Sequence, residues 1–250
     1  MPIKALLRGD SIDLSILAEL YPEPSDPVVT ADRSGYYLTS PTLPDSLVND
    51  AGEMLARARE LLRTINGAAR IVSTSYRPVE LSGEFRDSVD RQHVVVEAET
   101  AHARAHVFAA AVVTSADGQL VQAPAPPAPK YIQLAGQYPD VADALTILGK
   151  PAPLDWFDLY KLYEIVRDNV DPSPPDQSRK GNQKKLIDTG WVTKADLGAF
   201  TGSANHQLAS GNAARHAREP GSGPTRTMSL DEGTQFIRDL VSRWLSCRAT

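Results

Sequence analysis

Two short stretches near the C-terminus carry the residue types that phosphate chemistry needs. Asn205 and His206 are adjacent, and Arg215 and His216 follow further along, with Arg218 just after them. An imidazole can donate or accept a proton near neutral pH, and a guanidinium can hold a phosphate through two parallel hydrogen bonds. These residue types suit either in-line cleavage of RNA or simple phosphate binding. The alternative is a polar loop that satisfies the backbone carbonyls of its own helix.

The charge around these residues differs from that of the whole chain. The 250 residues carry a formal net charge of -5, whereas residues 179–218 hold seven basic and two acidic side chains, a local balance of +5. Such an excess is expected where an anionic partner binds, and also on an ordinary solvated face. RNA or another protein is the partner that we expect. The basic residues of this stretch are Arg179, Lys180, Lys184, Lys185, Lys194, Arg215 and Arg218.

A polar stripe on a strongly apolar helix is the second candidate site. Asp158, Lys161, Glu164 and Asp168 share one side of a segment that is otherwise rich in aromatic and aliphatic residues. Lys161 and Glu164 are spaced to pair along the helix. Nearly all-round apolar character predicts a central helix of a bundle, whose stripe faces either a cleft or solvent. Lys161 and Glu164 therefore join Asn205 and Arg218 as candidate binding residues.

Other chemistries lack their motifs in this chain. It has no Gly-x-x-x-x-Gly-Lys loop for phosphates, no Gly-x-Gly-x-x-Gly after a strand and no Gly-x-Ser-x-Gly turn. The single cysteine, Cys247, excludes an internal disulfide and a cysteine-based metal site. His102 and His106 would share a face on a helix, but on a strand they would lie roughly 13 Å apart, and the flanking alternation favours a strand. We therefore expect no metal and no cofactor.

The N-terminal half is predicted to combine one long helix with a small antiparallel sheet. Residues 1–44 are rich in proline, so we expect an irregular arm in which Gly35–Thr39 is a short strand. Asp45 is expected to cap a helix whose apolar spacing runs from 47 to 65, with a further turn to 72 as an alternative end. Alternation then predicts strands at 79–86, 93–99 and 107–114. Asp87 to Asp90 forms a turn, and Asp117-Gly118 predicts a second hairpin.

The C-terminal half is predicted to be an all-helical bundle. The proline run at 124–129 excludes a helix or central strand, so we assign a linker to 124–137, an α+β domain to 1–123 and a bundle domain to 138–250. Helices are expected to begin at the caps Asp140, Asp155, Thr193 and Ser229. Another helix should end at Gly190. The fold class is therefore α+β.

The composition predicts the compartment in which the protein is found. No segment approaches the ~20 apolar residues that span a bilayer, and the first ten residues do not resemble a secretory signal. With one cysteine in 250 residues, the expected compartment is the cytoplasm, and we expect no membrane among the partners.

The C-terminal half resembles the HEPN-like helical domains of bacterial toxin–antitoxin and anti-phage proteins. The resemblance rests on residues 159–165, 204–206 and 215–216, and on a last helix that ends with Trp244-Leu245. It implies a bundle of four or five helices, a homodimer formed through the C-terminal helices, and a metal-independent ribonuclease site at that interface. The ribonucleases of the family carry an arginine and a histidine four to six residues apart, whereas Arg215 and His216 are adjacent here.

Three functions stay open at this point. The first is a non-catalytic binding or regulatory protein of a bacterial defence system, which binds RNA or another protein. The second is an endoribonuclease, in which His206 or His216 moves the proton and Arg215 stabilises the charge on the phosphate in the transition state. The third is a structural subunit of a larger assembly.

Overall fold

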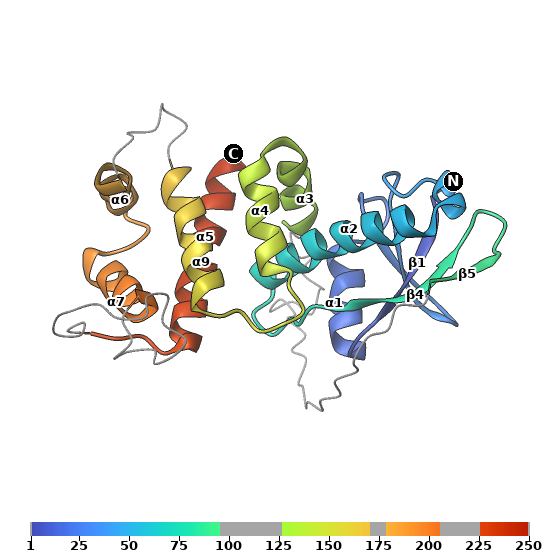
Figure 1. Cartoon of the computed structure of the whole chain (residues 1–250), viewed down its shortest axis with the longest axis horizontal. Coiled ribbons are helices and arrows are strands. Elements are labelled where there is room, and N and C mark those ends of the chain that lie inside the picture. Colours follow the sequence, from blue (N-terminus) through green and yellow to red (C-terminus); the bar gives the residue numbers. More distant parts are fainter. Residues whose placement is uncertain (1, 96–126, 171–178, 206–225, 250) are drawn as a thin grey trace, which may run out of the picture.

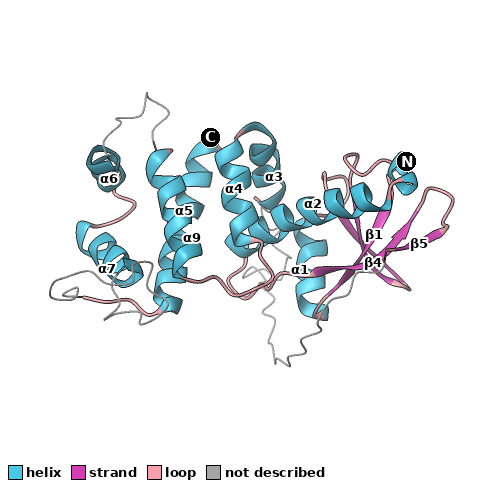
Figure 2. Ribbon diagram, in the orientation of Figure 1, coloured by secondary structure: helices cyan, strands magenta, loops and turns pink. Residues whose placement is uncertain are grey.

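The chain folds into a small sheet at one end and a set of helices at the other. The computed structural model describes residues 2–95, 127–170, 179–205 and 226–249. These residues form an α+β protein, as predicted (Figure 1). The helix α2 (Ala51–Val72) runs from the sheet to the helical end (Figure 2). None of the helices in the described ranges is long and apolar enough to cross a membrane.

The five-stranded sheet is antiparallel throughout and buries one face. Its order is β2-β3-β1-β4-β5, so β1 lies in the middle although it comes first in the chain. Ala5 of β1 is paired with Leu38 on one side and Phe85 on the other, and all three are fully buried. This match of buried positions fixes the register. The strands are β1 (Lys4–Arg8), β2 (Val28–Asp32), β3 (Gly35–Thr39), β4 (Glu80–Arg86) and β5 (Gln92–Val94).

The expectation of an irregular N-terminal arm is wrong. Residues 4–39 form β1, the helix α1 (Ser11–Leu20), β2 and β3, and only β3 was predicted. The prolines at 22, 24 and 27 lie between α1 and β2, and those at 41 and 44 follow β3. These prolines therefore lie between the helices and strands and not within them. The strand β1 was missed because Ala5, Leu6 and Leu7 are consecutive apolar residues, so its sequence shows no alternation.

The long helix begins later than its first acidic residue suggests. Asp45 opens a 3-10 turn, η1 (Asp45–Asn49), and Asp50 caps α2 by accepting a hydrogen bond from the Glu53 amide at 3.0 Å. The helix continues through Asn66-Gly67 to Val72, which is the longer of the two ends considered from the sequence. The expected cap at Asp45 is therefore corrected to Asp50.

The first hairpin is confirmed, and the remaining predicted strands lie outside the described residues. A turn over Asp87 to Asp90 joins β4 to β5, and Asp90 has a positive φ of 63°. The description of the chain stops just after β5, at residue 95. The predicted strand at 107–114, the hairpin at Asp117-Gly118, and His102 and His106 all fall in the range that follows.

A helix occupies most of the segment that was expected to be a linker. The helix α3 (Ala128–Gln137) has Pro129 in its first turn, where the missing N–H costs no hydrogen bond. The next helix, α4 (Pro139–Leu148), has Tyr138 at its N-cap position with no side-chain capping hydrogen bond, so the expected cap at Asp140 is wrong. Asp140 instead forms an ion pair with Arg248, with Oδ2 and Nη2 2.9 Å apart, although the geometry is not that of a hydrogen bond.

Three of the remaining helices begin where their caps were predicted. Asp155 and Thr193 accept hydrogen bonds from the amides three residues ahead, at 2.9 and 3.0 Å. Ser229 and Glu232 form a reciprocal capping box. Gly190, with a φ of +75°, follows the helix that ends at Asp188, as predicted. These helices are α5 (Trp156–Asp168), α6 (Arg179–Asp188), α7 (Lys194–Asn205) and α9 (Leu230–Arg248).

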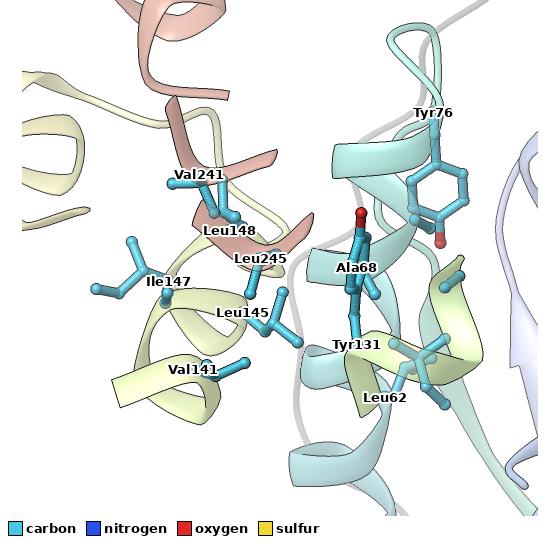
Figure 3. Close-up of a cluster of buried hydrophobic side chains, with 14 of the residues drawn as sticks. Leu62, Ala68, Tyr76, Tyr131, Val141, Leu145, Ile147, Leu148, Val241 and Leu245 are labelled. Carbon is cyan, nitrogen blue, oxygen red and sulfur yellow. The ribbon is translucent and has the colours of Figure 1, made fainter. Parts of the chain in front are cut away.

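The two halves meet where α2 crosses α4 at backbone contact. A Cβ atom on Gly67 would lie 2.0 Å from the carbonyl oxygen of Leu145, and one on Gly149 would lie 1.8 Å from that of Arg63. Figure 3 shows Leu145 pointing from α4 toward α2, with Leu148 close to α9 on the other side. The buried core is continuous from the sheet through α2 and α4 to α9. The division into two domains at 124–137 therefore coincides with no break in the described core.

Substituting alanine at Gly67 should destabilise the whole protein. We expect a loss of about 1–3 kcal/mol in the free energy of unfolding, because the added methyl group meets a backbone carbonyl that cannot move alone. Gly198→Ala is the matched control, since Gly198 lies in α7 with nothing within 4 Å of an added Cβ. That change should stabilise by up to about 1 kcal/mol through helix propensity. Urea unfolding measures both, and equal effects would contradict the close crossing.

Candidate functional site

Most of the predicted phosphate-binding residues lie outside the described part of the chain. His206, Arg215, His216 and Arg218 fall within 206–225, so their roles stay predictions. Asn205 is the last residue of α7. Its Oδ1 atom is buried and accepts no hydrogen bond from any described residue.

The polar stripe of α5 is split between solvent and ion pairs. Lys161 is exposed, whereas Asp158 is buried and receives a hydrogen bond from Lys150. The Oε1 atom of Glu164 lies 3.8 Å from Nη1 of Arg167. The stripe therefore does not form one continuous polar surface.

Arg167 is a buried guanidinium that the sequence did not single out. It donates two hydrogen bonds to the carboxylate of Asp168, at 2.8 and 2.7 Å, and lies over the ring of Tyr163. The hydrogen bonds to Asp168 hold the pKa of Arg167 above its usual value, although burial alone would lower it. Arg167 thus anchors the end of α5 and is not available to an external anion.

Both acidic residues of the basic stretch form ion pairs. Lys184 and Asp188 pair across one turn of α6 at 2.5 Å. Asp196 of α7 pairs with Arg226 at 2.7 Å, and hydrogen bonds from Thr193 and Arg226 lower the pKa of Asp196. Of these two pairs, only the first neutralises a basic residue of 179–218, because Arg226 lies beyond that stretch.

The β4–β5 hairpin is an ordered feature whose role the sequence did not suggest. The carboxylate of Asp87 is almost completely buried and accepts hydrogen bonds from the amides of Val89 and Arg91, at 3.0 and 2.8 Å. It also accepts one from Nε of Arg91 at 2.8 Å and lies 3.2 Å from Nε2 of His93. One side chain thus fixes the whole turn.

A second carboxylate ties the hairpin to the body of the protein. Asp45 accepts hydrogen bonds from the amide and hydroxyl of Ser88, at 2.9 and 2.7 Å. Arg86 lies over the ring of Tyr37, and its Nη1 atom is 3.6 Å from the carboxylate of Asp90. The tip of the hairpin is therefore held from two sides.

The ordered hairpin presents apolar side chains to solvent. Val89 at the tip is 67% exposed and Val94 on β5 is 60% exposed. They are two of five large hydrophobic side chains that are exposed among the described residues. Both valines lie on the same hairpin, one at its tip and one on its outer strand.

The backbone of β5 also has groups on its outer side that no described residue pairs with. The amide of Val95 donates to Gly83 at 2.9 Å, and that of Asp87 donates to Arg91 at 3.1 Å. Residues 91 and 95 thus face β4, and because strand residues alternate, Gln92 and Val94 direct their N–H and C=O groups away from it. Within the described residues, β5 is the edge of the sheet on that side.

Electrostatics favours the ionised form of both hairpin carboxylates. Burial by itself raises the pKa of Asp87, but the hydrogen bonds from Arg91, His93 and Val89 outweigh it and hold that pKa well below its usual range. Hydrogen bonds from the hydroxyl and then the amide of Ser88 lower the pKa of Asp45. Both groups therefore stabilise the fold when they are charged.

Comparison with known proteins adds no relative. No family model matches the chain, and no curated protein or solved structure is significantly similar to it. Within the part that the structure describes, no three His, Cys, Asp or Glu side chains lie together as metal ligands would. The geometry of the described residues is therefore the basis for any function assigned to them.

Acid should destabilise the protein in a way that depends on Asp87. Because its pKa is lower in the folded state, the unfolded chain binds more protons, and stability falls as the pH drops below about 5. We expect Asp87→Asn to be less stable than wild type at pH 7 and to lose less stability between about pH 5 and pH 2. Urea unfolding at a series of pH values measures this slope.

Asp45→Asn serves as the companion variant for that experiment. It removes the second low-pKa carboxylate at the same hairpin. The variant should therefore also lose less stability than wild type between about pH 5 and pH 2. If the unfolding free energy of both variants depends on pH as that of wild type does, the hairpin carboxylates are not the cause of the acid sensitivity.

Proposed function

We propose that this chain is a non-catalytic binding protein that takes up an extended segment of a partner protein along β5. The observation that carries the proposal is the fixed hairpin with outward backbone groups at Gln92 and Val94. Strand addition to a sheet edge draws its affinity from main-chain hydrogen bonds and its specificity from side-chain contacts on alternate residues. The exposed side chains of Val89 and Val94 would provide such contacts.

The opposite edge of the sheet offers less to a partner. The strand β2 packs against α1, and the amide of Val29 donates to the carbonyl of Tyr21 at 2.9 Å. Val29 is buried, and none of the five exposed large hydrophobic side chains belongs to β2. Exposed strand edges are ordinarily blunted by such coverage. The contrast between the two edges favours β5 as the docking edge.

The order of the hairpin lowers the cost of binding. A loop that must be ordered on association loses affinity to conformational entropy, whereas a surface already fixed does not. Asp87 and Asp45 hold the turn through hydrogen bonds that do not involve the outer edge. The edge is therefore presented to a partner in one conformation.

A proline at position 94 should block the partner and leave the sheet intact. Val94→Pro removes an N–H that points away from β4, so the ladder to β4 keeps its bonds. We expect extended peptides, selected by display on the purified full chain, to bind Val94→Pro about tenfold more weakly or worse. Val94→Thr keeps the N–H and the branched side chain, and it should bind as wild type does. Fluorescence anisotropy gives the dissociation constants.

Two outcomes would contradict this function. One is a set of selected peptides whose affinity is the same for Val94→Pro and wild type. The other is binding of RNA at about 50 mM salt, where electrostatic binding is strong, with no binding of any peptide. The second outcome would instead favour RNA binding by the basic stretch between 179 and 218.

A further inference from the structure

A small cavity lies at the seam between the sheet and the helices. Its volume is about 130 Å³. Four of its lining residues come from one face of α2, two from the start of β4, one from just before β4, and two from the turn after α4. Arg59 and Arg63 contribute the positive charge, and Leu62 and Val79 contribute buried apolar surface.

The walls of the cavity are held by hydrogen bonds and close backbone contact. Asn66 is buried, donates to the carbonyl of Val79 at 2.9 Å and accepts from its amide at 3.2 Å. The hydroxyl of Tyr76 also donates to the Oδ1 atom of Asn66. On the other side, Gly149 packs directly against the carbonyl of Arg63. The cavity is therefore part of the α2–α4 crossing and keeps its shape.

The charge of the lining favours an anion. Arg59 and Arg63 are one turn apart on α2, so their side chains leave the helix on the same side. Glu80 is the one carboxylate among the lining residues, and it is paired with Arg8 at 2.9 Å. The guanidinium of Arg63 has no hydrogen bond or ion pair with any described residue. Arg63 is therefore a cation at the rim that no described residue neutralises.

We propose that this cavity binds a small oxyanion, either a phosphate or a short carboxylate, with Arg63 as the principal ligand. An arginine can hold either group through two parallel hydrogen bonds. The volume of about 130 Å³ is below the roughly 300–1,000 Å³ of pockets for drug-sized ligands, and it suits a small anion. The apolar surface from Leu62 and Val79 suits the short carbon chain of a carboxylate. This site is separate from the hairpin edge and does not depend on its function.

An NMR titration of the full chain tests the site. Sodium phosphate and sodium acetate are added separately, with sodium chloride at matched ionic strength as the reference, and the amide signals of Gly149 and Leu81 are followed. We expect a saturable shift with at least one oxyanion and none with chloride. The oxyanion with the lower dissociation constant shows whether the site prefers a phosphate or a carboxylate.

Variants of α2 locate the ligand. Arg63→Gln should weaken binding by about ten- to a hundredfold, since a charge-assisted hydrogen bond is lost. Arg57→Gln is the control, because Arg57 is exposed on the same helix, pairs with Glu53 at 2.6 Å and does not line the cavity. It should bind as wild type does. Absence of a saturable shift with both oxyanions, or equal binding by Arg63→Gln and wild type, would overturn the proposal.

Discussion

The close crossing of α2 and α4 is the constraint on which the rest of the structure depends. Side chains usually keep two packed helices 8–10 Å apart, whereas Gly67 and Gly149 let backbone meet backbone here. The N-terminal half of α2 carries the sheet, and α4 carries the packing against α5 and α9. A displacement at this crossing would therefore move the sheet relative to the helices and open the cavity between them.

Arginine side chains reinforce the same architecture. Arg70 donates to the last carbonyl of α4, that of Leu148, at 2.7 Å, and Arg238 of α9 donates to the carbonyls of Arg70 and Thr74. Burial lowers the pKa of Arg70 to about 10, and it also lowers that of Arg238. These guanidiniums satisfy the carbonyl ends of helices, where cations are stabilised by the helix dipole. Both guanidiniums thus have a structural role, whereas that of Arg63 has no hydrogen bond or ion pair with any residue that the structure describes.

The strand β4 links the two surfaces to which we assign functions. Its first residues line the cavity, and its last residues lead into the hairpin. Between them, Phe85 is fully buried and paired with Ala5 of the central strand. The two surfaces are thus carried on one rigid element, while their recognition groups differ: side-chain guanidinium in one and backbone edge in the other.

The sequence by itself determined the features that arise from nearby residues. The capped starts of α5, α7 and α9, the stop at Gly190, the alternation of β4 and the turn at Asp87 all depend on interactions within a few positions. Tertiary structure decided the features that depend on distant partners. The strand β1 exists because it lies between β3 and β4, and Asp45 became a clamp on Ser88 because the sheet brings the two together. For the same reason, neither the edge position of β5 nor the cavity beside Arg63 could be predicted from local spacing.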